Sequence, residues 1–219
     1  MSYETEFNTI RARFHDNVVA NIAGVDPQVA AVITTSVSSV DNSFNDTTET
    51  LSVFTKSQTI LVSGFTEAAN NGLFTIKSVT ADKIIVTDAL TTEAAGDTIT
   101  ISSAFPVQYD NVSENAFVKP DDSKWARFHI MAGQGAQLTL GATKDHRFPG
   151  VAVVQIFIPQ GQGDKEAHEI ADVIKTYFMS TSDSGVTYRT PYELPGRSDT
   201  DTGEWQVNVN IPFYFDEIV

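Results

Sequence analysis

The sequence predicts an α+β protein: a mixed or antiparallel sheet flanked by two helices, with a small all-β domain inserted into it. Three observations support this prediction. Apolar residues recur at helical spacing near the start of the chain and again after residue 164. Short runs rich in Thr, Ser, Val and Ile fill residues 30–103, and longer strand patterns fill most of the remainder. Helices combined with such strands are typical of the α+β class.

The N-terminal segment is expected to form a helix from about Tyr3 to about Ala20. Its apolar residues are three or four positions apart, so they share one helical face. The glycine and proline of "AGVDP" should end the helix. The residues of the apolar face are Phe7, Ile10, Phe14 and Val18.

Residues 30–103 are expected to form a separate all-β domain with its own small core. The runs are rich in β-formers, and turn residues such as those of "EAANNG" and "TADK" separate them. Such a block is best accommodated as an insertion into a discontinuous host made of residues 1–29 and 104–219. The expected strands are Ala31–Val40, Leu51–Phe54, Thr59–Val62, Gly72–Thr80, Lys83–Thr87 and Asp97–Ile101.

The C-terminal part of the host should contain most of its sheet. Strands are expected in "PVQYDN", "KWARFHIMA", "QLTLGA" and "VAVVQIFIP", and the last is so apolar that it should be central. A second helix should follow "QGQGD", with Asp164 as its N-cap and Glu166 in its first turn. A loop, "RTPYELPGRSDTDTGE", and a final strand, "WQVNVNIPFYF", complete the host.

The composition excludes several classes of protein. With 28 acidic and 14 basic residues the net charge is -14, which argues against a large phosphate-binding surface. A channel through which DNA slides without sticking is still compatible with negative charge. The chain has no cysteine, so disulfides and thiolate metal sites are excluded. We expect no membrane association, because no run approaches the ~20 apolar residues of a membrane helix and the start lacks a signal-peptide pattern.

No motif in the sequence indicates catalysis. The four histidines are scattered, and "HEIAD" lacks the second histidine of a helical zinc site. "QGQGD" lacks the Lys-Ser/Thr ending of a phosphate loop, and "DTDTGE" is only the start of a calcium loop. No Gly-x-Ser-x-Gly elbow occurs. We therefore expect a structural protein and not an enzyme, with no catalytic residues, no cofactor and no metal site.

The host segments, taken in order, resemble a known family. "EFNTIRARFHDNV", "PVQYDN", "WARFHI", "LGATKDHRFPGVAVVQIFIPQGQGDKEAHEIADVIKTYF" and "GEWQVNVNIPFYF" resemble the tail terminator proteins of long-tailed, non-contractile bacteriophages, the group that includes lambda's terminator. The resemblance covers both flanks of the inserted domain. It implies an α+β subunit of a hexameric ring that caps the tail tube, stops its polymerisation and provides the surface to which the head attaches.

The resemblance also implies partners and a location. The partners are further copies of the chain, the tail tube protein and a head-tail connector protein, while DNA passes through the ring lumen without specific binding. The location is the head-proximal end of the tail in the virion, after assembly in the host cytoplasm.

A closed ring needs two different patches on each subunit, and arginines and aromatic residues are enriched at interfaces. For each arginine, a solvated surface charge is an equally good interpretation. "WARFHI" and "DHRFPG" lie in segments that recur in the family. The interface candidates are Arg11, Arg13, Trp125, Arg127, Arg147 and Phe148.

Two other functions remain open at this stage. The chain could be a neighbouring head-tail connector or minor tail protein. The inserted domain resembles a small β module that recurs in phage virion proteins, and it could bind glycan, although decoration or contact with an adjoining ring is favoured.

Overall fold

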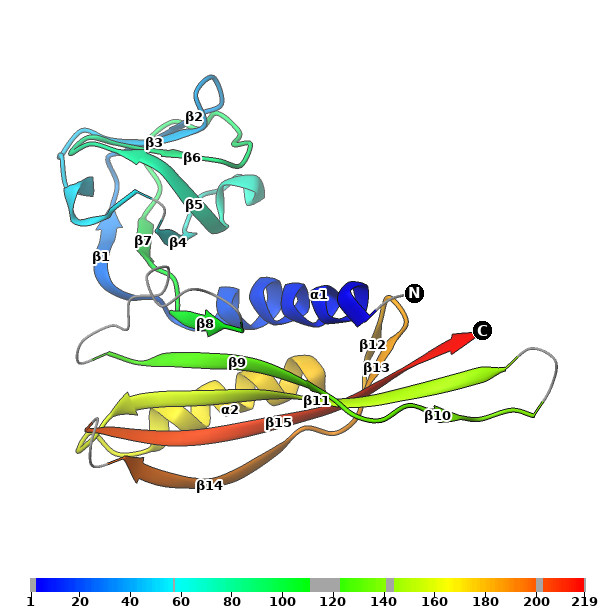
Figure 1. The fold of residues 1–219 in the computed structure, drawn as a ribbon. Coiled ribbons are helices and arrows are strands. Elements are labelled where there is room, and N and C mark those ends of the chain that lie inside the picture. The colour runs from blue at the N-terminus through cyan, green and yellow to red at the C-terminus, as the bar shows by residue number, and fades with distance from the viewer. Residues whose placement is uncertain (1–2, 57, 111–122, 141–143, 200–202, 219) are drawn as a thin grey trace. The chain divides into compact units, whose positions relative to one another are not determined.

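The structure is a computed structural model that describes residues 3–56, 58–110, 123–140, 144–199 and 203–218. The chain divides into two compact units. The larger unit consists of Met1–Asn21 and Pro106–Val219, and the smaller unit consists of Ile22–Phe105. Among the described residues there are two sheets and two α-helices (Figure 1), so the expected α+β class is confirmed.

The smaller unit is a seven-stranded antiparallel sheet with the order β1-β7-β4-β5-β6-β3-β2. Its strands curl around a core that includes Phe44, Leu51, Ile60 and Ile84, none of which is exposed. The expected boundary at residue 30 falls inside β1, which pairs with β7. The strands are β1 (Val25–Val32), β2 (Thr35–Ser38), β3 (Ser43–Asp46), β4 (Thr59–Ser63), β5 (Gly72–Val79), β6 (Lys83–Val86) and β7 (Ile99–Ser103).

Three expectations for the smaller unit were wrong. The strand expected at 31–40 is divided between β1 and β2. The segment expected as a strand at 51–54 is a 3-10 turn, Leu51–Val53, which buries Leu51. The expected set of strands also lacked β3, in which Phe44 enters the core and the flanking polar side chains are satisfied by neighbours.

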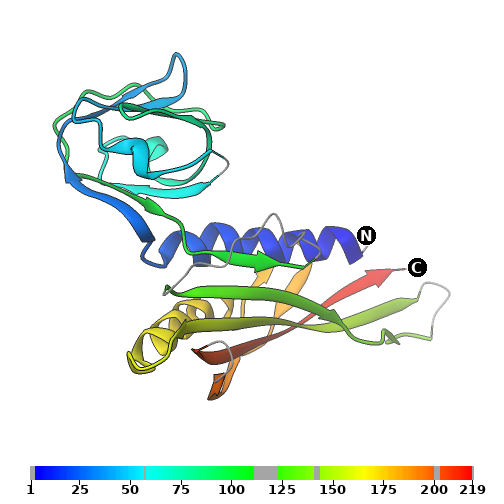
Figure 2. The same ribbon diagram turned by 60° about the vertical axis from the view of Figure 1, so that its left-hand side comes forward.

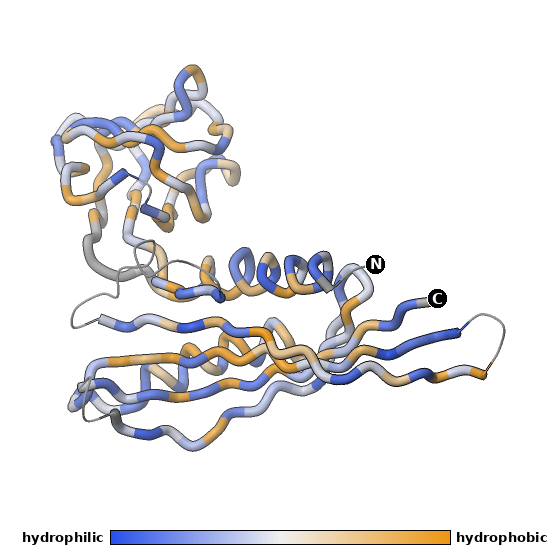
Figure 3. The backbone as a smooth tube through the Cα atoms, viewed as in Figure 1, coloured by the Kyte–Doolittle hydropathy of each residue, from blue (hydrophilic) through white to orange (hydrophobic). Residues whose placement is uncertain are grey.

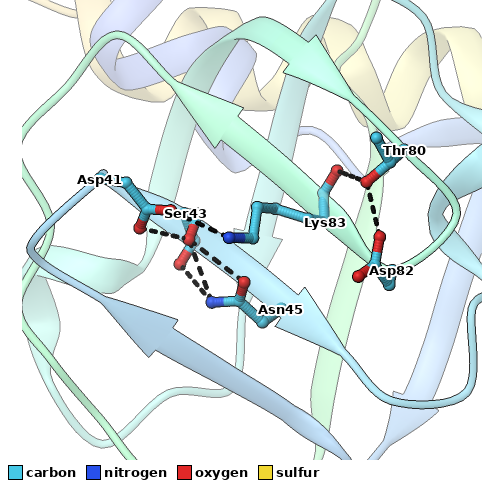
Figure 4. A network of polar contacts seen from close by, with 6 residues as sticks. All are labelled: Asp41, Ser43, Asn45, Thr80, Asp82 and Lys83. Atoms are coloured by element: carbon cyan, nitrogen blue, oxygen red, sulfur yellow. Dashed lines mark hydrogen bonds and ion pairs between the residues drawn. The ribbon is translucent and has the colours of Figure 1, made fainter.

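The polar residues on and next to β3 form a network of hydrogen bonds and an ion pair (Figure 4). The Ser43 hydroxyl donates to Asp41 Oδ1 at 2.7 Å, and Lys83 Nζ lies 3.0 Å from Asp41 Oδ2. Asn45 Nδ2 donates to the Ser43 hydroxyl at 3.0 Å. These contacts allow a polar sequence to form a strand between β2 and β6.

The larger unit is built on one eight-stranded sheet with the order β12-β13-β15-β11-β9-β8, in which β10 pairs with β11 and β14 pairs with β15. The strands β11 and β15 pair antiparallel from Asp145↔Ile218 to Pro159↔Glu204, and β8 is parallel to β9. The strands are β8 (Val107–Tyr109), β9 (Trp125–Ala132), β10 (Ala136–Gln137), β11 (Asp145–Pro159), β12 (Ser182–Asp183), β13 (Val186–Tyr188), β14 (Tyr192–Asp199) and β15 (Glu204–Ile218).

The N-terminal helix is helical over the expected segment, although not uniformly. α1 (Tyr3–Arg13) continues through a π-helical turn, Phe14–Val18, and a 3-10 turn, Val19–Asn21. Figure 3 shows hydrophobic residues along one side of α1 and hydrophilic residues along the other.

The second helix, α2 (Lys165–Phe178), was also expected, and it lies alongside β11 and β15 (Figures 1 and 2). Asp164 occupies the N-cap position but its side chain makes no capping hydrogen bond. Its carboxylate instead lies 3.4 Å from His168 Nε2. None of the described helices is long and apolar enough to span a bilayer.

Two expectations for the larger unit were also wrong. The segment expected as a loop before the final strand contains β14, which pairs with β15 through a register shift between Leu194 and Arg197. This bulge accommodates the Pro-Gly pair that made the segment look like a loop. In "QLTLGA" only the start of the segment pairs, as part of β10, and residues 141–143 lie outside the described part of the chain. The same is true of residues 200–202 in "DTDTGE".

Candidate functional site

The sheet of the larger unit has one covered face and one open face. On β11 the residues Ala152, Val154 and Ile156 are completely buried, whereas the intervening Val151 and Val153 are only half-buried. Because β11 is a central strand with neighbours on both sides, the difference reflects what covers each face.

Both helices pack on the covered face. Phe14 lies 4.5 Å, ring to ring, from Phe128 of β9. Phe178 of α2 lies 5.0 Å from Tyr188 of β13. The strand registers place Phe128 and Tyr188 on the same face as Val154. The helices therefore leave the other face open.

The open face combines amide, apolar and arginine side chains in rows across the strands. One row runs from Arg127 through Gln155 to Asn208, and the next runs from His129 through Val153 to Asn210. We define the open face as Arg127, His129, Met131, Val151, Val153, Gln155, Asn208, Asn210, Pro212, Tyr214, Tyr192 and Leu194.

Arginines gather on and around this face, and the strands of the larger unit contain no lysine. Arg147 and Arg189 lie 4.0 and 5.4 Å from the Tyr214 ring centre. Arg197 donates two hydrogen bonds to Gln206 Oε1, and Arg127 donates to Gln108 Oε1. Arginine and aromatic residues without lysine are the composition of a protein interface more than of a phosphate-binding surface.

Of the two predicted residues at one end of the open face, only Arg127 is exposed. Trp125 is 4% exposed, stacks on Phe157 at 4.1 Å and donates its Nε1 hydrogen to Glu204 Oε1 at 2.7 Å. The Arg127 guanidinium lies 5.8 Å from the Trp125 ring and 5.9 Å from the Phe157 ring. The Arg127 guanidinium therefore packs over the buried Trp125 ring.

Arg147 and Phe148 lie on a three-stranded extension that we call the arm, made of β10, residues 145–150 of β11 and residues 213–218 of β15 (Figure 1). Arg147 Nε and Nη2 each donate to Asp216 at 2.7 Å. These bonds raise the pKa of Arg147 and lower that of Asp216. Phe148 stacks on Phe215 at 5.3 Å.

Gly135 makes the packing of Phe148 possible. A Cβ atom at residue 135 would lie 2.4 Å from Phe148 Cε1. The glycine thus lets β10 approach the ring, and the half-buried Phe148 helps to hold the arm together.

The two arginines of α1 differ from each other. Arg13 was expected to be exposed, but its side chain is 18% exposed. It donates to the carbonyl of Tyr177 from Nη2 at 2.6 Å and to the Thr181 hydroxyl at 3.1 Å. Arg13 therefore joins α1 to the end of α2 within one subunit. Arg11 makes a local contact with Asn8 at 3.3 Å.

Sequence reasoning missed the residue that closes the outer edge of β9. Asp110 accepts hydrogen bonds from His129 Nδ1 at 2.6 Å and from the backbone N–H of Ile130 at 3.0 Å. Asp110 and His129 are 19 positions apart in the chain, and no local motif joins them. By occupying a backbone donor, Asp110 limits pairing of another strand at this edge.

Two further features were missed. The end of the arm carries Leu138 and Leu140, which are 51% and 99% exposed. At the opposite end of the sheet, a hollow of about 510 Å³ is lined by Gln160, Gly161, Gly163, Asp164 and Trp205. Among the described residues that line it, the charged one is an acid, Asp164, which does not suit an anion. In the described part of the chain, no group of three or more His, Asp or Glu side chains is placed to hold a metal.

A comparison with models of protein families identifies a family for the chain. A family model described as "Phage tail terminator protein" matches residues 85–213, from the end of β6 to β15. No curated protein matches the chain. One solved structure, whose title gives no function, is 21% identical with a TM-score of 0.39, and the alignment covers 52% of this chain and 80% of that chain.

Proposed function

The chain belongs to the phage tail terminator family, and on this premise we propose that its copies form a ring, a hexamer by the resemblance, that caps the tail tube. The ring stops tube polymerisation and provides the surface for head attachment at the head-proximal end of the tail. The family is one of phage structural proteins and not of enzymes, and the chain is accordingly a virion component.

The observation that supports the ring most directly is the open face of the sheet. Val151 and Val153 of the central strand β11 are only half-buried, and arginines surround this surface. A subunit of this kind gains stability when other copies cover such surfaces. Among the predicted interface residues, Arg127 and Arg147 have the positions best suited to this role, whereas Trp125 and Arg13 act within the subunit.

We assign the ring partners from the same premise. The tail tube protein meets one rim and the head-tail connector protein meets the other, after assembly in the host cytoplasm. DNA passes through the lumen without specific binding, because the chain carries a net charge of -14 and repels phosphates over most of its surface.

The smaller unit is proposed to be an inserted domain that contacts adjoining virion parts. Val25 and Ser103 are paired in the β1-β7 ladder, so the two ends of the unit lie about 5 Å apart. Glycan binding is less well supported, because the phenylalanines of this unit are buried and its sequence contains no Trp or Tyr for a sugar to pack on. A short linker in place of residues 22–105 should preserve ring formation.

A gene-deletion phage tests the proposed function. Loss of a terminator should give tails of uncontrolled length that do not join heads, as measured by electron microscopy. Loss of a connector would instead leave tails of normal length that stay unjoined, which would favour the alternative role. Uniform tails that join heads without this protein would rule out both, and a plasmid copy of the wild-type gene serves as the control.

A further inference from the structure

The arm end and the hollow lie at opposite ends of the same strand pair. We define the arm tip as Leu138, Thr139, Leu140 and Lys144, next to the start of β11, while Gln160 directly follows the end of β11. The strand between them rises about 3.3 Å per residue, so roughly 45 Å separates the two features. Because β11 and β15 pair over this whole length, one subunit cannot bring its own tip to its own hollow.

The described residues of the arm tip are positioned by hydrogen bonds and present apolar side chains. The backbone N–H of Leu138 donates to the carbonyl of Asp145 at 2.7 Å, and the N–H of Asp145 donates to the Thr139 hydroxyl at 2.9 Å. Leu140 is nevertheless 99% exposed and Leu138 is half exposed. A single exposed leucine is unremarkable, but two at one end of the arm form an apolar knob.

The hollow is open partly because two of the residues that line it are glycines, which have no side chain. Gly161 and Gly163 have φ of +91° and +84°, and a Cβ at either would meet no atom within 4 Å. The Gln160 side chain donates to the Ser198 hydroxyl at 2.7 Å, and its N–H donates to the carbonyl of Gly203 at 3.0 Å, which fixes one rim. Trp205 contributes an aromatic wall.

The two surfaces are also complementary in charge. The hollow has Asp164 at its rim, with a carboxylate that is 60% exposed. The arm tip carries an exposed Lys144. The arm tip is thus an apolar knob with a cation, and the hollow is lined by an aromatic ring, glycines and an anion. Opposite charges placed this way favour one docking orientation.

We infer that the arm tip of one copy docks into the hollow of the next copy, with Leu138 and Leu140 against Trp205 and Lys144 facing Asp164. A contact between two different patches, repeated from subunit to subunit, is the head-to-tail type that closes into a ring. This inference rests on the proposed function, because it assumes that copies of the chain assemble, and it specifies the junction between them.

The first test is the change Leu140→Asp, with Val40→Asp as the matched control. Val40 is 94% exposed but belongs to the smaller unit, so both changes replace an exposed apolar residue with an acid. Mass photometry should show that Leu140→Asp raises the concentration needed for ring formation by about tenfold or more, while Val40→Asp leaves it unchanged. Unaltered circular dichroism establishes that both variants fold. Equal assembly of the two variants would overturn the inference.

A charge exchange tests the pairing of the two surfaces. Lys144→Asp and Asp164→Lys should each weaken association, and the double variant should recover most of the loss. Asp164 makes no side-chain capping hydrogen bond, so its replacement should leave α2 intact. Weakening by both single changes without recovery in the double variant would mean that the tip docks elsewhere, including on the tail tube protein.

Mixing variants tests the head-to-tail arrangement. One copy carries a defective tip (Leu140→Asp) and the other carries a defective hollow (Trp205→Ala). The intact tip of the second copy can still dock into the intact hollow of the first, so each pair retains one good junction. The mixture should therefore form dimers but no rings. Rings of normal size in the mixture would contradict the inference.

The proposed function and this junction can fail separately. If the wild-type chain forms no ring in solution, the variants are scored in purified tails from complemented phage. If the Leu140→Asp protein is incorporated into tails as well as the wild-type protein and the tails have uniform length, the proposed junction is wrong. The terminator role is then left intact. Uniform, head-joined tails from the deletion phage would overturn the terminator role itself.

Discussion

One buried carboxylate in each unit, Asp46 in the smaller and Glu6 in the larger, shows a contrast in hydrogen bonding. In the smaller unit Asp46 is 1% exposed, and its two oxygens accept hydrogen bonds from the hydroxyls of Thr34, Thr48 and Thr50. In the larger unit Glu6 is also 1% exposed, yet neither carboxylate oxygen has a hydrogen-bond partner in the described structure.

The same contrast extends to aromatic residues. The smaller unit buries all its phenylalanines, from Phe44 to Phe105. The larger unit leaves Tyr192 of the open face half exposed and places Tyr214 between two arginines. The aromatic residues of the smaller unit are thus used within its own core, while the larger unit retains aromatic surfaces that other molecules can cover. Stability should therefore depend on assembly mainly in the larger unit.

The largest expected effect comes from the core of the smaller unit. Phe44 is fully buried and packs against Phe65 and Phe74 at ring distances of 5.7 and 5.3 Å. Phe44→Ala should cost about 3–5 kcal/mol in that unit. Hydrogen exchange of the full chain should show faster exchange in residues 22–105 and unchanged exchange in β11 and β15. Equal acceleration in both units would show that the smaller unit does not fold independently.

Asp46 should contribute the next largest effect, and it depends on pH. Burial opposes ionisation, but hydrogen bonds from Thr34, Thr50 and Thr48 outweigh it and hold the pKa of Asp46 well below its usual range. Because the folded pKa lies below the unfolded value of about 3.9, this stabilisation is present above that pH and is lost as the pH falls towards the folded pKa.

The test of Asp46 is the stability of the smaller unit between pH 7 and pH 2. Asp46→Ala should cost about 2–3 kcal/mol at pH 7, since it leaves hydroxyls and backbone donors unpaired. It should also flatten the loss of stability in acid. Asp41, whose pKa is lowered to about 2 chiefly by the hydrogen bond from Ser43, continues to titrate in the variant. An acid response identical to that of the wild type would exclude Asp46 as its main source.

Arg13 and Arg11 form a matched pair within the larger unit. Arg13 joins α1 to the carbonyl of Tyr177, whereas the hydrogen bond of Arg11 among the described residues is to nearby Asn8. Arg13→Ala should cost about 2 kcal/mol, and Arg11→Ala should cost less than about 0.5 kcal/mol. Urea denaturation of the larger unit measures both values. Equal costs would contradict the structural role assigned to Arg13.

The smallest expected effect has the opposite sign. Glu6 is buried without a hydrogen-bond partner in the described residues, so Glu6→Met should raise the stability of the larger unit by about 1 kcal/mol. Glu4→Met, at an exposed position of the same helix, is the control and should change little. A loss of stability in Glu6→Met would reveal a partner for the carboxylate, and the contrast with Asp46 would then disappear.

The spacing of apolar residues within one segment was enough to predict α2 and β9. α2 was expected because apolar residues repeat at three and four over its whole length. The alternation of "WARFHIMA" likewise predicted a strand with two unlike faces, and Phe128 is buried while Arg127 is exposed. β14 was missed because the bulge that lets Pro195 and Gly196 remain in the sheet exists only opposite β15.

The candidate site was predicted only in part. Arg127 and Arg147 were predicted as interface candidates by residue type, which could not show that Trp125 and Arg13 are held within the subunit. The apolar run "VAVVQIFIP" suggested burial on both faces, since Val151 and Val153 are as apolar as Val154. No pattern in the run distinguishes the face that the helices cover.

The sequence by itself therefore determined both α-helices, most of the strands, the α+β class and the family, because hydrophobic spacing and ordered segments are local properties. The tertiary structure decided which face of the sheet stays open, where the arginines gather and how far the arm extends. Those properties depend on the register between β9, β11 and β15. Register sets which side chains meet across strands that are distant in the chain, and spacing within one segment cannot specify it.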